Sequence, residues 1–406
     1  MQEDWQLILR QPQSAVLYHE KEKRIQLVKK NVSNCPLCGS QLNQMFVDSD
    51  YFKLLSSLQK EEPETSNLPK SLFNDGYYAR FFIEQNQLGR GAKGYVFKCL
   101  HVLDTMHLGL FAVKKIPVGD NHEWLLNMLK EVTLLQQLKH ENIIEYKHSW
   151  LETAQLSEFA PRIPVLFILM EYANGNNLQD YIILNDSIGK NSDHTMSINE
   201  SKYKSGTGIN KFNQVVRYLE SESIIQLFLD IMNGLAHLHS LNIIHKDIKP
   251  NNLLLHFKDP ISRLDIPRVL ISDFGECEQL QQMRHNRTGF TGTMEYVAPE
   301  LLDKQHAFDK SSDIYAVGLV LYFICFTILP FTQVDNVDIL KQEILSRHDF
   351  DYFEDNSRVD SSLKNAIKLM LHNDPTKRPS ADQILRQGKL LKEQLANRPH
   401  STLLLE

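Results

Sequence analysis

The sequence predicts an α+β protein with two lobes, the first rich in strands and the second helical, preceded by a small strand-containing extension. Residues 81–172 contain short apolar segments typical of strands, with one amphipathic helix among them at 123–138. Residues 221–395 instead have mainly helical periodicity. A block of strands followed by a block of helices is typical of the α+β class.

The composition is that of a soluble globular protein of 406 residues, with 42% apolar and 23% charged residues. The net charge of −6 argues against a protein built mainly to hold nucleic acid or anionic lipid. Five cysteines are too few for a disulfide framework, and the acidic start lacks the apolar core of a signal peptide. We therefore expect no nucleic-acid partner and a cytoplasmic location, with the nucleus as the alternative.

Composition changes along the chain predict its organisation. We expect an extension at 1–55, a linker at 56–75, a main domain at 76–395 with lobes 76–170 and 171–395, and a tail at 396–406. Residues 185–213 are rich in Ser, Asn, Lys and Gly, and we interpret them as a flexible insertion in the second lobe. The insertion either docks partners or is a tolerated loop.

The extension combines two predicted strands, near 14–18 and 24–28, with a cysteine pair. Cys35 and Cys38 stand in a Cys-x-x-Cys-Gly sequence, which resembles half of a zinc ribbon. Tetrahedral zinc needs two more ligands, and the chain has no second cysteine pair at that spacing. A degenerate half-site, a site completed by a partner and no metal at all therefore stay open.

An uncharged segment at 314–331 is long enough to cross a membrane. The alternative is a helix buried at the centre of a large domain, which is also apolar on all sides. Glu300 needs a buried cation, and Arg378 supplies one from the other side of this segment. A membrane would separate the two, so we predict the buried helix and no membrane span.

Three glycines mark a phosphate-binding turn. Gly89, Gly91 and Gly94 let backbone N–H groups approach phosphate oxygens, which a β-carbon would obstruct. The same spacing occurs in dinucleotide sites, where a helix follows the third glycine. Here residues 95–100 continue as a strand, which favours a β-hairpin.

A lysine and a glutamate follow the hairpin. Lys114 lies on a predicted strand, and Glu131 lies 17 residues later on the predicted helix. Each alone is more often a solvated charge, but a lysine on such a strand can reach phosphates when a carboxylate orients it.

The strongest motif is His245-Lys-Asp247-Ile-Lys249-Pro-Asn-Asn252, followed by Asp273-Phe-Gly at the end of a predicted strand. A carboxylate, an amine and an amide at this spacing, with a second carboxylate beside glycine, can move a proton and hold a hard cation. Further on, Thr293 is placed to line a substrate groove, and Asp313 is placed to brace the loop at 245–252 through backbone amides.

The order of these motifs resembles that of the eukaryotic protein kinases over about three quarters of the chain, from 81 to 395. The resemblance implies the bilobal protein kinase fold and transfer of the γ-phosphoryl group of Mg-ATP to protein Ser or Thr hydroxyls. It also implies the roles of the catalytic group. Asp247 is expected to be the catalytic base, and Lys249 and Lys114 are expected to offset charge on the phosphates. Glu131 is expected to orient Lys114, and Thr293 to line the substrate groove.

The same resemblance implies the ligand contacts. Magnesium is expected at Asn252 and Asp273. The nucleotide is expected against Leu88, Gly89, Gly91, Gly94, Val96, Lys114, Glu171, Ala173 and Asn177. Segments 146–152 and 288–293 are similar to kinases of the translation initiation factor α-subunit, and segments 116–119 and 124–126 to fungal Iks-type kinases.

Two expectations concern the regulation of the kinase and the alternative that it is catalytically inactive. Lys246 stands where the family usually has Arg, so control by phosphorylation of the loop that follows Gly275 is expected to be weaker than in the family, although Thr288 is a candidate autophosphorylation site. The alternative function is a catalytically silent kinase-fold scaffold that acts through the extension and the insertion. The enzyme is favoured because the chain has all five of the polar residues that the reaction needs, namely Lys114, Glu131, Asp247, Asn252 and Asp273.

Overall fold

The structure is a computed structural model. It describes residues 5–11, 14–19, 24–29, 68–91, 93–119, 121–156, 160–184, 205–279, 293–302, 308–332, 336–346 and 359–396. Cys35, Cys38 and Thr288 lie outside the described residues. The chain divides into two compact units, and Gly76–Pro117, Glu123–Trp150 and the chain from Leu166 onward belong to the larger one.

The N-terminal extension contains a three-stranded antiparallel sheet in the order β1-β2-β3. The strands are β1 (Trp5–Gln11), β2 (Ser14–His19) and β3 (Arg24–Lys29). The second and third coincide with the two strands predicted from clusters of apolar residues. The first was not predicted.

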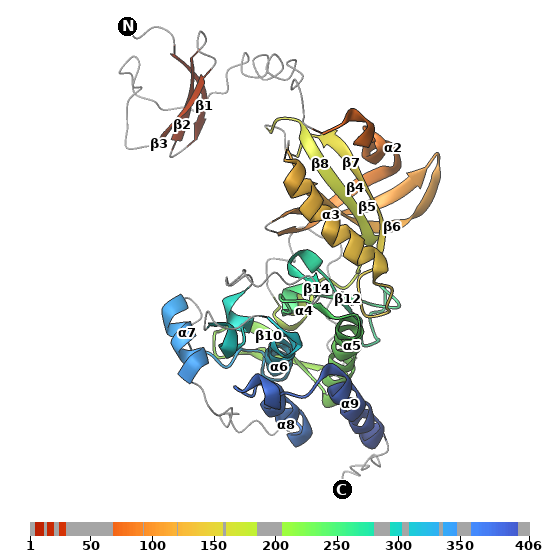
Figure 1. The fold of residues 1–406 in the computed structure, drawn as a ribbon, viewed down its shortest axis with the longest axis vertical. Helices are drawn as coiled ribbons and strands as arrows, with labels where there is room; N and C mark the ends of the chain where they lie inside the picture. The colour runs from red at the N-terminus through yellow and green to blue at the C-terminus, as the bar shows by residue number, and fades with distance from the viewer. Residues whose placement is uncertain are drawn as a thin grey trace. The chain divides into compact units, whose positions relative to one another are not determined.

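A five-stranded sheet in the order β4-β5-β6-β8-β7 forms the strand-rich part of the molecule. It consists of β4 (Phe82–Gly91), β5 (Gly94–Leu103), β6 (Met106–Pro117), β7 (Tyr146–Ala154) and β8 (Ile163–Glu171), with the short helix α2 (Tyr77–Phe81) leading into it. Helix α3 (His122–Gln137) lies along one face of the sheet (Figure 1). The predicted apolar face of this helix is the one it buries, because Leu125, Met128, Val132 and Leu135 are all at most 4% exposed.

The segment interpreted as an insertion differs in part from that prediction. Residues 205–213 are not loose: β9 (Ser205–Ile209) pairs with β10 (Val215–Leu219) as an antiparallel hairpin. Val216 is fully buried and bridges Ile183, and the Asn210 amide donates to the Thr327 carbonyl. The hairpin therefore packs onto the helical part of the molecule, although its composition is that of a loop.

The helical part is built around α5 (Ser221–Ser240) and α6 (Lys310–Phe326). Around them lie α4 (Leu178–Ile182), α7 (Val337–Ser346), α8 (Ser361–Met370) and α9 (Ala381–Ala396), as Figure 1 shows. Every residue of α6 from Ser312 to Phe326 is buried, as predicted for the uncharged segment. Among the described residues, no helix combines the length and apolar character needed to cross a membrane.

Two small antiparallel strand pairs carry the polar loops of the helical part. These are β11 (Ile243–Ile244) with β14 (Glu278–Gln279), and β12 (Leu253–His256) with β13 (Arg268–Ile271). Most of their apolar residues, among them Ile243, Leu253 and Val269, join the core formed by α5 and α6. The loops at 245–252 and 272–277 therefore start and end on fixed backbone.

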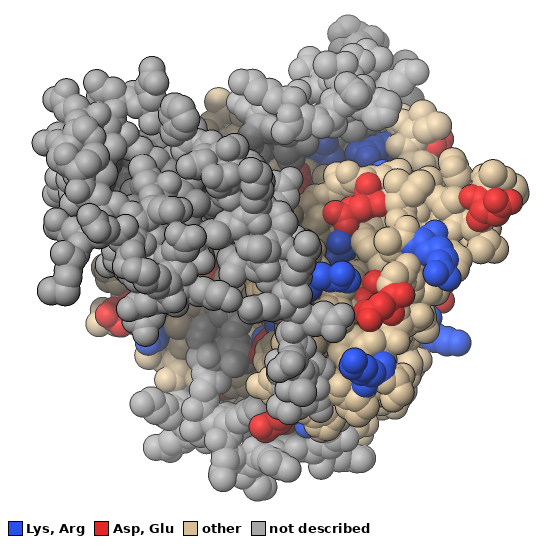
Figure 2. All heavy atoms as spheres, turned by 90° about the horizontal axis from the view of Figure 1, so that it is seen from above, with Lys and Arg blue, Asp and Glu red and all other residues tan. Residues whose placement is uncertain are grey.

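The surface of the described residues carries charges of both signs. On the described part of the face in Figure 2, Lys and Arg side chains are interspersed with Asp and Glu. This distribution is in line with the mild net charge.

Candidate active site

The glycine-rich turn is the expected β-hairpin between β4 and β5. Gly89 faces Val96 across the hairpin, and Val96 faces Lys114 on the next strand. A β-carbon on Gly94 would collide with the Lys115 carbonyl oxygen, so this position requires glycine. Gly89 and Gly91 have no atom within 4 Å of such a carbon, which leaves their backbone open to a ligand.

Lys114 lies between two carboxylates. Its Nζ is 3.0 Å from Glu131 Oε1 and 3.2 Å from Asp273 Oδ1. Burial disfavours the ammonium, but the two carboxylates outweigh that effect, so the pKa of Lys114 is raised. The other Glu131 oxygen, Oε2, is buried and has no hydrogen-bond partner within the described residues. The ammonium of Lys114 thus links the sheet to α3 and to the loop after β13 through two ion pairs.

Asp273 is held in an uncommon conformation. Its φ of 61° is in the left-handed region, which costs a non-glycine residue energy and persists only where the surroundings fix it. Phe274, the next residue, is 2% exposed and meets the His245 ring edge-on at 5.3 Å. Burial raises the pKa of Asp273, but Lys114, together with His245 and Lys93, outweighs burial and the net shift is downward. The carboxylate is therefore ionised and directed by its neighbours.

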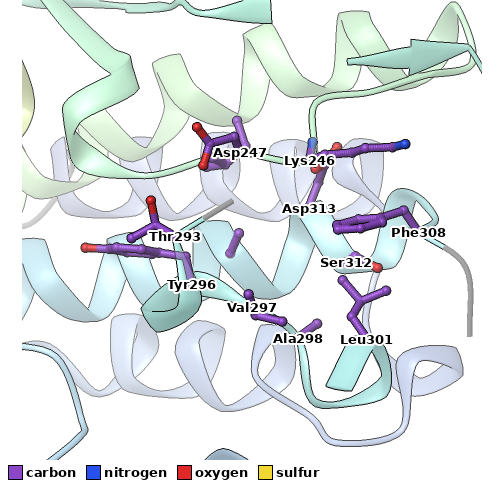
Figure 3. A pocket seen from close by; sticks show the side chains of 12 residues that line it. Lys246, Asp247, Thr293, Tyr296, Val297, Ala298, Leu301, Phe308, Ser312 and Asp313 are labelled. Atoms are coloured by element: carbon purple, nitrogen blue, oxygen red, sulfur yellow. Dashed lines mark hydrogen bonds between the residues drawn. The ribbon is translucent and has the colours of Figure 1, made fainter. Parts of the chain in front are cut away.

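The loop at 245–252 gathers the remaining polar groups. Lys249 Nζ lies 2.8 Å from Asp247 Oδ2 and 2.7 Å from the Thr293 hydroxyl. The Asn252 amide donates to Asp247 Oδ2 at 2.8 Å, so its own oxygen is the atom able to face a cation. In Figure 3 the Thr293 hydroxyl points toward Asp247. A carboxylate, an ammonium and a hydroxyl thus meet at one point.

Asp313 braces this loop from the buried helix α6. Its Oδ2 accepts from the His245 backbone N–H and its Oδ1 from the Lys246 N–H, each at 2.9 Å. Its Oδ2 also lies 3.0 Å from the His239 ring. Burial raises the pKa of Asp313, but the hydrogen bonds and charges contributed by His239 and His245 together outweigh burial, and the pKa is lowered. The predicted contact of this carboxylate with backbone amides is confirmed.

The side chain of Lys246 points away from Asp247. Figure 3 shows its amine on the side opposite Asp247, beside Phe308. The ammonium pairs with Glu278 on β14 and lies 5.2 Å from the centre of the Phe308 ring. A carboxylate of the chain itself therefore already neutralises the cation that stands in place of the family's arginine.

The loop from Thr293 to Leu302 is fixed by a buried ion pair. Arg378 Nη1 and Nη2 each lie 2.7 Å from one oxygen of Glu300, and the Arg378 side chain has no exposed surface. Two parallel hydrogen bonds give such a pair a defined geometry. The predicted partner of Glu300 is thus confirmed, and the two residues lie on opposite sides of α6 in the sequence.

The residues expected to contact the base and ribose of the nucleotide differ in their exposure and in their hydrogen bonds. The Glu171 N–H donates to the Glu145 carbonyl at 2.9 Å, and the expected contact of the Glu171 backbone with the nucleotide stays a prediction. Leu88 is 39% exposed at the hairpin, and Ala173 is half-buried. Asn177 caps α4, since its side chain accepts from the Asp180 N–H and donates to the Asp180 carboxylate. Its expected contact with ribose stays a prediction.

The donor set suits a hard divalent cation. A carboxylate at Asp273 and an amide oxygen at Asn252 are the ligand types that magnesium takes, with phosphate oxygens and water completing its shell. For zinc the described part of the chain offers no cluster of three or more His, Cys, Asp or Glu side chains. The pair at Cys35 and Cys38 stays a prediction, because it lies outside that part.

Sequence reasoning missed two charged residues of this region. Lys93, in the glycine-rich turn, reaches the Gly275 carbonyl, and Glu278 neutralises Lys246. The unusual lysine between two glycines was a signal that could have been followed. Glu278 offers no such signal, because only the pairing of β11 with β14 places it beside the loop at 245–252.

Comparison with known proteins identifies relatives of the chain. A family model described as "Protein kinase domain" matches residues 82–388. The probable serine/threonine-protein kinase iksA of Dictyostelium discoideum is 36% identical over 79% of this chain and 33% of its own length. The interferon-induced, double-stranded RNA-activated protein kinase of Mus musculus is 28% identical over 76% and 51%. The chain thus spans between a third and about half of the length of these relatives.

Proposed function

The chain belongs to the protein kinase family, and we propose that it is an active serine/threonine kinase that phosphorylates proteins with ATP. One observation carries the proposal: Lys249 lies within hydrogen-bond reach of both Asp247 and Thr293. That contact places a base, a cation and a hydroxyl-lined groove together. A silent scaffold has no need of this arrangement.

The chemistry follows from these groups. A substrate hydroxyl oxygen attacks the γ-phosphorus, the bond to the bridging β-phosphate oxygen breaks, and ADP leaves. Asp247 accepts the hydroxyl proton, and the Lys249 ammonium offsets the charge on the phosphoryl oxygens. Asp273 and Asn252 would hold magnesium, which would neutralise charge on the phosphates when bound. Lys114, fixed by Glu131, would orient the α and β phosphates.

Specificity for serine and threonine rests on Lys249 and Thr293. The resemblance implies this pair for Ser/Thr kinases, and here the two side chains are in contact at 2.7 Å. Of the relatives quoted above, iksA carries the name of a serine/threonine-protein kinase, which supports the same substrate class.

The test is the identity of the modified residue. Purified protein is incubated with labelled ATP, magnesium and a cell lysate, and the labelled sites are identified by mass spectrometry. We expect label on serine and threonine above the background of lysate alone, and we expect this excess to be lost with Asp247→Asn. Label mainly on tyrosine, or equal label with the variant, would refute the proposal.

A further inference from the structure

Lys93 connects the glycine-rich hairpin to the loop that carries Asp273. It lies at the turn between β4 and β5, and its ammonium donates to the Gly275 carbonyl. The same ammonium is 3.4 Å from Glu276 Oε1, and only 19% of the side chain is exposed. A lysine in a hairpin turn is normally solvated, so this degree of burial needs a reason.

Position 275 admits this contact because it has no side chain. A β-carbon there would lie 2.7 Å from the Lys93 Nζ and 3.3 Å from its Cε. Such a carbon would push the ammonium off the carbonyl. The sequence thus supplies a cation at one end of the contact and a bare backbone at the other.

The sheet therefore reaches the Asp273 loop at two points. From β6, Lys114 contacts Asp273 itself, and from the hairpin turn Lys93 contacts the two residues that follow Phe274. The two cations hold successive parts of one short loop. Movement of the hairpin away from that loop has to break the Lys93 contacts.

We propose that Lys93 is a positioning residue that fastens the hairpin to the Asp273 loop before nucleotide arrives, so that hairpin closure and Asp273 orientation are coupled. This inference rests on the proposed function for its consequence in nucleotide binding. The fastening itself does not, because it joins residues of this chain alone. A hairpin ordered in advance has less conformational entropy to lose when phosphates bind.

The experiment uses the full chain with Lys93→Met, Lys93→Arg and the control Arg90→Met. Arg90 is an exposed cation on the same hairpin, stacked on Tyr95 at 5.2 Å. A hydrogen bond from a charged group contributes enough free energy that its loss should speed amide exchange about tenfold. Hydrogen exchange at 89–96 is measured without nucleotide, and affinities for Mg-ATP and adenosine are measured by calorimetry.

We expect Lys93→Met to speed exchange of the hairpin about tenfold and to weaken Mg-ATP about tenfold, with adenosine unchanged. Lys93→Arg should restore most of both, and Arg90→Met should match the wild type. Unchanged exchange would overturn the proposal even if Mg-ATP binding weakened, since Lys93 would then act only on phosphate. Equal weakening of adenosine would overturn it as well. The exchange measurement keeps its meaning if the chain proves inactive as a kinase.

Discussion

Removing the cation from the pair of Glu300 and Arg378 should destabilise the protein strongly. Arg378→Met leaves the Glu300 carboxylate, whose side chain is 9% exposed, with the Ser312 hydroxyl 3.3 Å away as its hydrogen-bond partner among the described residues. A buried charge that loses its partner destabilises a protein by about 3–5 kcal/mol. For a domain of this size, that loss corresponds to a Tm lower by roughly 5–8 °C.

Differential scanning calorimetry measures the change, and two variants control it. Lys377→Met alters the exposed neighbour of Arg378 and should shift Tm by less than about 1 °C. Glu300→Met combined with Arg378→Met removes both charges and should recover most of the loss. If Arg378→Met alone unfolds within about 1 °C of the wild type, the reasoning about an uncompensated carboxylate is refuted.

Four further outcomes follow from the site. Asp313→Asn should slow phosphoryl transfer about tenfold in a steady-state assay, since it weakens the acceptor of two loop amides. The pKa of Asp313 is lowered in the folded protein, so its contribution to the free energy of unfolding should be complete above about pH 4 and should disappear as the pH falls further. A contribution that increased at lower pH would contradict this expectation. Glu131→Gln should lower the transfer rate about tenfold by freeing Lys114, and an unchanged rate excludes an orienting role. Since Glu278 already neutralises Lys246, phosphatase treatment should change the rate less than about threefold, and complete inactivation rules out that interpretation.

The polar centre of the site was predictable because its spacing is dictated by chemistry. Lys114, Glu131 and Asp273 come from three distant segments, yet their order along the chain predicted that they meet. Glu300 and Arg378 were predictable by a different argument, since a buried carboxylate requires a cation. These predictions depend on residue type more than on exact backbone position.

The features that the sequence did not predict depend on tertiary packing. The hairpin of β9 and β10 has the composition of a loop, but Val216 is buried against the helical part and orders the pair of strands. Lys93 was passed over because a lysine near a turn is usually solvated, and its burial arises only once the hairpin reaches Gly275. Neither contact has a periodicity that the sequence could reveal.

Asp247→Asn tests the central claim most directly, because it removes the base and keeps the size of the side chain. We predict that the variant binds Mg-ATP as the wild type does and transfers phosphoryl groups at least about a hundredfold more slowly. Calorimetry measures the binding, and incorporation of label from ATP measures the transfer. A variant that transfers at the wild-type rate would contradict the claim that the carboxylate beside Lys249 is the base.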